Sequence, residues 1–116
     1  MLIMYVDDAI RQLMKECHET AVDKGWYALG DRNFGELIAL MHSELSEALE
    51  EHRNGEPFNN FRFVDGKPEG IAVELADVLI RVFDACEHKS IPLADALMSK
   101  MEYNRTRPYR HGGKKA

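Results

Sequence analysis

The sequence predicts an all-α protein, a four-helix chain that forms an oligomeric helical bundle. Apolar residues recur at spacings of three and four along most of its length, which is the period of an α-helix. Asn, Gly and Pro interrupt this pattern and divide it into segments of helical length. The chain has 116 residues and no internal repeat, so residues 1–116 are expected to form a single domain.

The first helix is expected over about residues 5–23 and the second over about residues 33–53. The apolar positions of the first helix that fit the period are Ala9, Leu13, Met14, Cys17 and Ala21. The stretch GWYALGDRN separates the two helices with two glycines and a polar cluster. Asn33 can cap the free N–H groups of the second helix, and Glu36 follows three residues later as in a capping box. An Asn-Gly pair then ends that helix.

A loop over residues 54–68 is expected to lead into the third helix, at about residues 68–88. A fourth helix is expected at about residues 92–104. Each of these two helices begins with a proline, which fits a first helical turn because no N–H is needed there. Pro108 and the Gly-Gly pair that follows it are expected to prevent further helix.

Composition narrows the class of protein. A net charge of −5, with 45% hydrophobic residues, argues against a nucleic-acid partner, because duplex-binding proteins present a basic face. No apolar run reaches the roughly 18 residues of a membrane helix, so no membrane span is expected. The N-terminal stretch turns acidic at Asp7 and Asp8, unlike a secretory signal. Cys17 and Cys86 form no C-x-x-C pair, and we expect reduced thiols in a cytoplasmic protein.

The third helix has an unusual distribution of polar residues. At 100° per residue, apolar side chains cover most of its circumference, and the polar side chains fall in one narrow stripe. The residues of this stripe are Glu74, Asp77, Arg81 and Asp84. An ordinary surface helix has a wide polar face. The stripe is therefore expected to face something other than bulk water.

The second helix carries a matching acidic pair, Glu44 and Glu47, at the edge of its apolar face. If the two helices pack antiparallel, these carboxylates converge with Glu74 and Asp77, and like charges this close repel. A hard divalent cation removes the repulsion, and oxygen ligands favour Mg²⁺, with Mn²⁺ as a substitute, over zinc. Di-iron chemistry is disfavoured because no histidine follows a glutamate by three residues. The alternative is that the acids form a solvated face.

The two acidic pairs and the basic ending resemble a known family. The sequence has E-L-S-E from Glu44, E-L-A-D from Glu74, and the ending SKMEYNRTRPYRHGG. This is similar to the all-α NTP pyrophosphatases, and among them to the MazG-like group, over about residues 25–113. That family's signature is E-x-x-E, a spacer and E-x-x-D. Its phosphate-binding ending matches Lys100, Asn104 and Arg107.

The resemblance implies a MazG-like nucleotide pyrophosphohydrolase domain. Such an enzyme cleaves a nucleoside triphosphate to the monophosphate and pyrophosphate, using Mg²⁺ to activate a water that attacks the α-phosphorus. The implied metal ligands are Glu44, Glu47, Glu74 and Asp77, and either Glu44 or Glu47 is the catalytic base. The implied substrate-binding residues are Lys100, Asn104 and Arg107.

Three further expectations stay open at the level of sequence. Trp26 either stacks on the substrate base or packs against the protein. The basic tail from about residue 105 either binds phosphate or is a solvated appendage. A homodimer or homotetramer is expected, because a four-helix chain of this size has limited means of covering the third helix. The alternatives to an enzyme are a helical nucleotide sensor that does not hydrolyse and a protein-interaction module.

Overall fold

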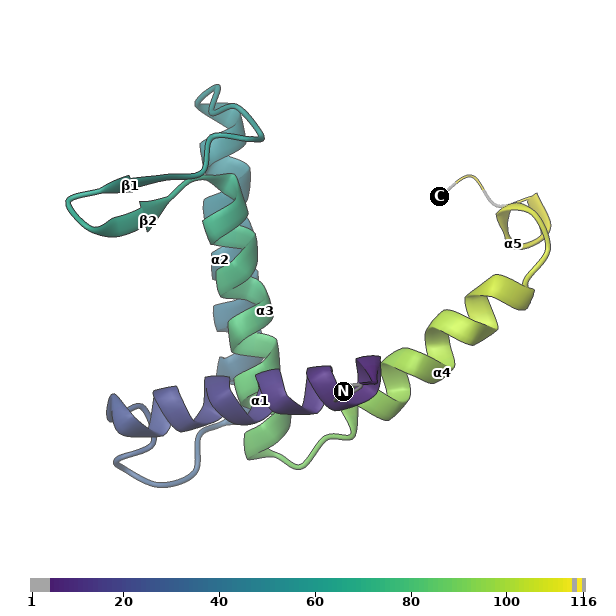
Figure 1. Ribbon diagram of the computed structural model, residues 1–116, viewed down its shortest axis with the longest axis horizontal. Helices are drawn as coiled ribbons and strands as arrows, with labels where there is room; N and C mark the ends of the chain where they lie inside the picture. Colours follow the sequence, from purple (N-terminus) through teal and green to yellow (C-terminus); the bar gives the residue numbers. More distant parts are fainter. Residues whose placement is uncertain (1–4, 114, 116) are drawn as a thin grey trace, which may run out of the picture.

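The computed structural model describes residues 5–113 and 115 and is mostly helical, as predicted (Figure 1). The helices are α1 (Val6–Asp23), α2 (Phe34–Arg53), α3 (Ile71–His88), α4 (Leu93–Thr106) and the single turn α5 (Arg110–Gly113). A short antiparallel hairpin, β1 (Arg62–Val64) and β2 (Lys67–Glu69), lies between α2 and α3. Across the described residues, none of these helices is long and apolar enough to cross a membrane.

Several helix ends follow the local signals in the sequence. The side chain of Asn33 accepts a hydrogen bond of 3.0 Å from the backbone N–H of Glu36, so the predicted cap of α2 is confirmed. Pro92 lies directly before α4. Arg107, the residue before Pro108, has an extended backbone and ends α4, because a proline disfavours helical geometry in its predecessor.

The predicted start of the third helix is wrong. Pro68 lies in β2, opposite Phe63 of β1, and α3 begins only at Ile71. The cause is the Asp65-Gly66 pair, whose positive φ angles of 53° and 80° suit a two-residue hairpin turn. The expected loop is therefore partly a hairpin.

The C-terminal glycines were expected to exclude helix, and α5 contradicts this in part. Within that turn Arg110, Gly112 and Gly113 all have positive φ angles. Two of these three residues are glycines, which adopt such angles without steric cost. The turn at α5 is thus a local consequence of the same Gly-Gly pair.

Gly70 joins the hairpin to α3, and we expect Gly70→Ala to destabilise the protein. Its φ of 124° is a conformation that L side chains rarely adopt, and a Cβ there would overlap the carbonyl oxygen of Asn60. Strain of this kind costs on the order of 1–3 kcal/mol. Thermal melting measures the effect, with Gly55→Ala as the control, because Gly55 also has positive φ but open space around it. Equal losses in the two variants would contradict the role of the Asn60 contact.

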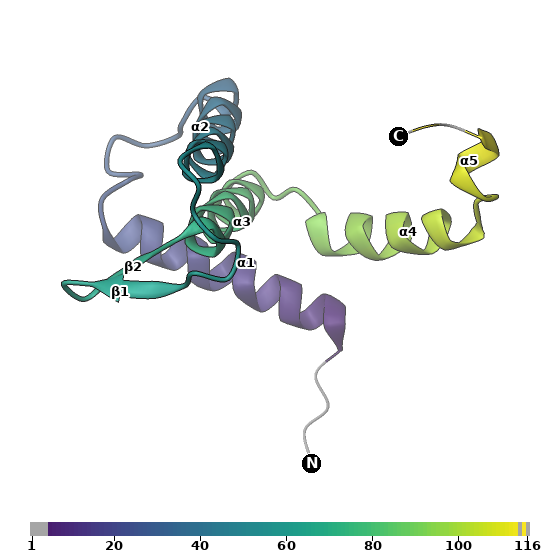
Figure 2. The ribbon, with the colours of Figure 1, turned by 90° about the horizontal axis from the view of Figure 1, so that it is seen from above.

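The α2–α3 hairpin is the centre of the fold. The two helices lie side by side and run in opposite directions, and α1 crosses α3 near its C-terminal end (Figures 1 and 2). In the same views α4 packs against α1 and then leads away from α2 and α3. The buried apolar core is small for this length and comprises Met14, Leu37, Ala48, Ile71, Ala85, Cys86 and Ala94.

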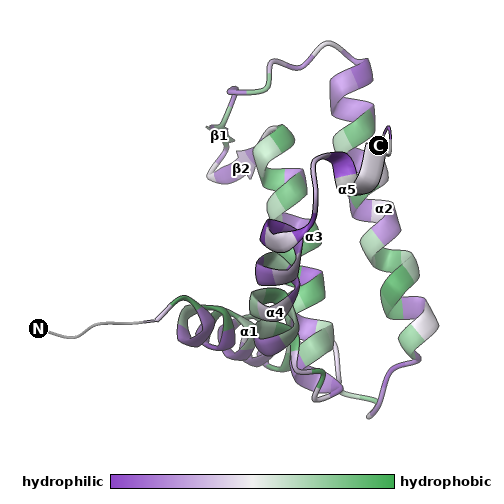
Figure 3. Cartoon of the chain, turned by 90° about the vertical axis from the view of Figure 1, so that its right-hand side faces the viewer, coloured by the Kyte–Doolittle hydropathy of each residue, from purple (hydrophilic) through white to green (hydrophobic). Residues whose placement is uncertain are grey.

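The described chain leaves much apolar surface uncovered. Its radius of gyration is 17.0 Å, against about 13 Å for a compact domain of this length. Its accessible surface is 8880 Å², against about 6,500 Å² for a compact monomer of this mass. Hydrophobic bands recur along α2 and α3 (Figure 3), and Leu49, Leu75 and Leu79 are each about half exposed. The helices expose a face that a compact monomer would bury.

Candidate active site

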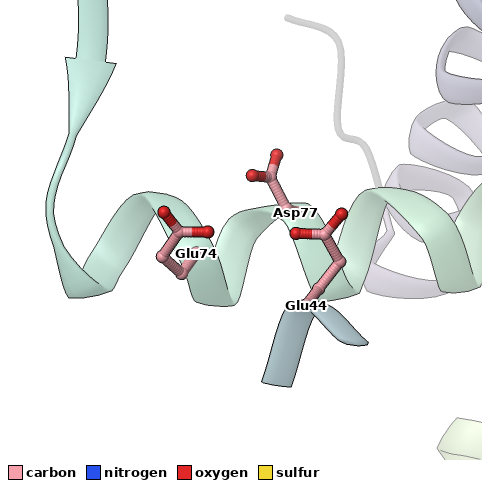
Figure 4. A group of neighbouring side chains, drawn as sticks. All are labelled: Glu44, Glu74 and Asp77. Carbon is pink, nitrogen blue, oxygen red and sulfur yellow. The ribbon is translucent and has the colours of Figure 1, made fainter. Parts of the chain in front are cut away.

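Antiparallel packing of α2 and α3 brings the acidic pairs together. Glu44 extends from the middle of α2 toward Glu74 and Asp77, which lie one turn apart on α3 (Figure 4). One carboxylate oxygen from each of these three residues lies within 4.8 Å of the others. Glu44 is only 8% exposed. The helical spacing seen in the sequence thus becomes a cluster of three carboxylates in space.

Glu47 joins this cluster through Glu74. Burial, a hydrogen bond to Glu47 and the charges of Glu47, Asp77 and Glu44 raise the pKa of Glu74 to about 7. Glu47 itself is exposed, one turn along α2 from Glu44. All four acids therefore interact, with Glu47 at the solvent side.

Arg81 is the cation that touches the cluster. Its Nε donates a hydrogen bond of 2.7 Å to Oε1 of Glu44. Burial and the negative charge of Glu44 raise the pKa of Asp77, and the Arg81 and Lys67 charges oppose that shift. One arginine does not neutralise four carboxylates, which leaves a strongly electronegative site.

A pocket of about 900 Å³ opens beside the acids. Its wall includes Glu44, Asp77 and Arg81 on one side and Trp26 on another. Trp26 is 62% exposed, so it does not pack in the core. The guanidinium carbon of Arg32 lies 5.8 Å from the centre of the Trp26 ring, within the range of a cation–π contact. The pocket therefore combines an exposed aromatic face with carboxylates.

Asp84 fixes the segment that carries Trp26. It is a buried carboxylate on α3, with oxygens 2.8 Å from Nδ1 of His18 on α1 and 2.9 Å from the hydroxyl of Tyr27, which donates to it. Burial and this hydrogen bond raise the pKa of Tyr27 to about 12. Asp84 thus ties α1 and the α1–α2 loop to α3 and does not belong to the three-carboxylate cluster.

A second acid fastens the other end of the same loop. Asp31 lies 2.7 Å from Nε2 of His88 and 2.8 Å from Nζ of Lys89, both at the C-terminal end of α3. Hydrogen bonds with Lys89 and His88, together with the charge of Lys89, lower the pKa of Asp31 to about 2. With anchors at Tyr27 and Asp31, the loop presents Trp26 and Arg32 to the pocket in a fixed position.

The structure does not bring the basic ending to the acids. Lys100, Asn104 and Arg107 lie on or at the end of α4, and none of them lines the pocket. Lys100 Nζ lies 4.8 Å and the Arg107 guanidinium carbon 5.4 Å from the ring centre of Tyr103 on the same helix. Of the basic tail, residues 114 and 116 lie outside the described residues. Within one copy of the chain, the predicted phosphate-binding residues are separated from the predicted metal ligands.

The raised pKa of Glu74 predicts a pH-dependent stability in the absence of divalent cations. Between its ordinary pKa of 4.5 and about 7, the folded protein holds a proton that the unfolded protein has released. The free energy of unfolding should therefore fall as pH rises through this window. Melting at a series of pH values in EDTA tests this, with Glu74→Gln as the comparison, because glutamine does not titrate. The prediction fails if both proteins show the same pH dependence over this window.

Sequence reasoning did not predict how Arg32, Tyr27 and Asp84 shape the pocket. Asp84 had a visible signal, because it continues the polar stripe of Asp77 and Arg81 at helical spacing. Tyr27 and Arg32 had no such signal, because they lie in a loop, where no helical periodicity indicates which way a side chain points. Their placement depends on the anchoring contacts with α3.

No family model, no curated protein and no solved structure matches this chain.

Proposed function

We propose that this protein is a Mg²⁺-dependent nucleoside triphosphate pyrophosphohydrolase, which releases pyrophosphate and the nucleoside monophosphate. The observation that carries the proposal is the carboxylate cluster of Glu44, Glu74 and Asp77, within 4.8 Å, of which Glu44 and Asp77 line a pocket of about 900 Å³. A pocket of that size accommodates a nucleotide. The acids and the exposed aromatic face suit the two ends of such a ligand.

The donor set fits a hard divalent cation. Oxygen atoms of carboxylates are the ligands that Mg²⁺ and Mn²⁺ prefer, and the cluster contains no cysteine or histidine that would favour zinc. Burial raises the pKa of Glu74 first, and the charges of the neighbouring acids add to the rise; a bound cation would relieve this repulsion between the acids. When bound, Mg²⁺ would polarise phosphate oxygens and activate a water molecule.

Among the acids, Glu47 is the better candidate for accepting the proton of the attacking water. Glu44 is only 8% exposed, and its Oε1 already accepts a hydrogen bond from Arg81, which leaves it less accessible to a water molecule. Glu47 is exposed, and its hydrogen bond with Glu74 places it beside the cluster. In this assignment Glu44, Glu74 and Asp77 hold the metal, and Glu47 lies at the solvent side.

The base of the nucleotide is assigned to Trp26. Stacking of a base on an aromatic side chain contributes about 1–3 kcal/mol, so Trp26→Ala should raise KM about 5- to 150-fold and change kcat little. Trp26→Phe keeps an aromatic face and should retain most of the affinity. Steady-state kinetics of pyrophosphate release distinguish these effects, and an unchanged KM in Trp26→Ala would remove Trp26 from the substrate site.

The test of the proposed function is a substrate panel. Purified protein is incubated with each ribo- and deoxyribonucleoside triphosphate and Mg²⁺, and pyrophosphate and monophosphate are both measured. Equimolar formation of the two products, lost on adding EDTA, is expected. A nucleotide sensor would bind a triphosphate without forming product, and an interaction module would show neither binding nor a Mg²⁺ effect on melting.

A further inference from the structure

We propose that Lys67, on strand β2 of the hairpin, is a catalytic residue that binds the β- and γ-phosphates of the nucleotide, which leave as pyrophosphate. This inference deepens the proposed function and rests on it, because it assigns Lys67 to the leaving group of that reaction. It is separate from the phosphate contacts predicted for the α4 ending. It also makes a statement about pyrophosphate binding, which holds or fails without any hydrolysis.

The pocket of about 900 Å³ lies beside α3 between two projecting segments. The hairpin projects from the N-terminal end of α3, and the C-terminal half of α1 projects toward the same side of the molecule from near the other end of α3 (Figures 1 and 2). Lys67 of the hairpin lines the pocket, and so does Trp26, which follows α1 in the chain. These two side chains therefore belong to opposite walls of one pocket.

Position along α3 sets the order of the groups in the pocket. The loop that carries Trp26 is anchored through Asp84, in the C-terminal half of α3. The hairpin joins α3 through Gly70, directly before the first residue of the helix. Asp77 lies between these two points, about 10 Å from Asp84 along the helix at 1.5 Å per residue. A ligand that reaches from Trp26 to Lys67 therefore passes the carboxylates on its way.

Contacts at the base of the hairpin hold β2 in place. Glu56, before the hairpin, accepts a hydrogen bond of 2.6 Å from the side-chain amide of Asn60 and pairs with Arg62 of β1. On the other strand's side, Gly70 lies so close to the carbonyl oxygen of Asn60 that a Cβ would overlap it. Both ends of the hairpin thus meet at Asn60, and Lys67 is carried by a docked segment.

The ammonium group of Lys67 is available to a phosphate near the acids. Its Nζ lies 3.7 Å from a carboxylate oxygen of Glu69, beyond hydrogen-bond distance, and its side chain is 76% exposed. Arg81, in contrast, donates a hydrogen bond of 2.7 Å to Glu44. Burial and the charge of Glu44 raise the pKa of Asp77, and the Lys67 charge acts against this rise, so it reaches the acids. A lysine is a flexible point charge that can turn from a weak pair to a phosphate.

The order of groups in the pocket places the leaving group at Lys67. With the base on Trp26 and the α-phosphate beside the acids, the β- and γ-phosphates extend toward the hairpin. The oxygen of water bonds to the α-phosphorus, and the bond from that phosphorus to the bridging oxygen breaks. Its electron pair leaves with pyrophosphate, and the water's proton passes to Glu47. Lys67 stabilises the negative charge that develops on pyrophosphate.

Binding is tested first without turnover, by calorimetry with inorganic pyrophosphate and Mg²⁺. Lys67→Met removes the charge and keeps most of the side-chain length, so it should weaken pyrophosphate binding about 10- to 150-fold, as expected for a lost hydrogen bond to a charged group. Lys67→Arg should keep most of the affinity. Lys15→Met is the matched control, because Lys15 is an exposed lysine of α1 beside Glu19 and is not among the residues that line the pocket. Equal affinities in Lys67→Met and Lys15→Met overturn the proposal, as does a parent protein that binds no pyrophosphate.

Kinetics and product inhibition then test which phosphates Lys67 meets. Lys67→Met should lower kcat/KM for the triphosphate by the same factor of about 10 to 150. The inhibition constant of the nucleoside monophosphate, the other product, should stay as in the parent, because this product lacks the β- and γ-phosphates. If monophosphate inhibition weakens by the same factor, the assignment to the leaving group is overturned. A parent protein that is inactive on every triphosphate overturns the proposed function, whereas calorimetry still decides whether Lys67 binds pyrophosphate.

Discussion

Glu74→Gln is expected to lower kcat/KM about a thousand-fold or more and to abolish most of the stabilisation by Mg²⁺. Glu74 shares the carboxylate cluster with Glu44 and Asp77, and removing one charged ligand weakens both metal binding and the charge stabilisation that metal provides, on the order of 4 kcal/mol. Glutamine has the same shape and does not titrate, so the fold should persist. The expected loss is therefore one of chemistry and not of structure.

Thermal melting with and without Mg²⁺ separates a loss of metal binding from a loss of structure. In the parent, Mg²⁺ at about 100 times its Kd should stabilise the folded state by about 2.7 kcal/mol, which raises Tm by roughly 10 °C. Glu74→Gln should lose most of this gain. Glu87→Gln is the matched control, because it removes an acid of α3 that lies outside the cluster. If Glu74→Gln and Glu87→Gln gain equally from Mg²⁺, the acids do not form the metal site.

The acidic cluster was predictable because it depends on two local regularities. Helical spacing places Glu74 one turn before Asp77, and the apolar periods of α2 and α3 orient their acids toward a common seam. Helices that are consecutive in the chain usually lie side by side, which makes the antiparallel packing of α2 and α3 the expected arrangement. The Asp65-Gly66 turn was equally local, and the hairpin it forms was overlooked although such a pair is a strong turn signal.

The remaining features depend on contacts that no local pattern encodes. Trp26 reaches the pocket because Tyr27 bonds to Asp84 and Asp31 bonds to His88, across distances in sequence of 57 residues each. The direction of α4 likewise depends on its packing against α1, where Arg11 pairs with Asp95 at 2.7 Å. The sequence predicted a phosphate-binding ending, but no local pattern encodes where α4 carries that ending relative to the acids.

Arg107→Ala is the second change with a large expected effect, a loss of about 2–4 kcal/mol of charge stabilisation, or roughly 30- to 1,000-fold in kcat/KM. Arg107 lies where α4 ends, with an extended backbone before Pro108. Lys100 lies on the same helix as a second cation. An arginine binds phosphate through two parallel N–H groups, so alanine removes both contacts at once.

The matched control is Arg105→Ala. It removes the same charge two residues before Arg107, and the Arg105 side chain pairs with Glu102. A second control deletes residues 114–116, beyond α5. Both controls should keep most of the parent's pyrophosphate release at saturating Mg²⁺, because their charges lie outside the matched pattern of Lys100, Asn104 and Arg107. If Arg107→Ala retains full kcat/KM, the ending is a solvated appendage, and the phosphates must instead meet the arginines that line the pocket, Arg32 and Arg81. In that case the ion pair between Arg81 and Glu44 would have to open when substrate binds, and Arg81→Ala would become the more damaging change.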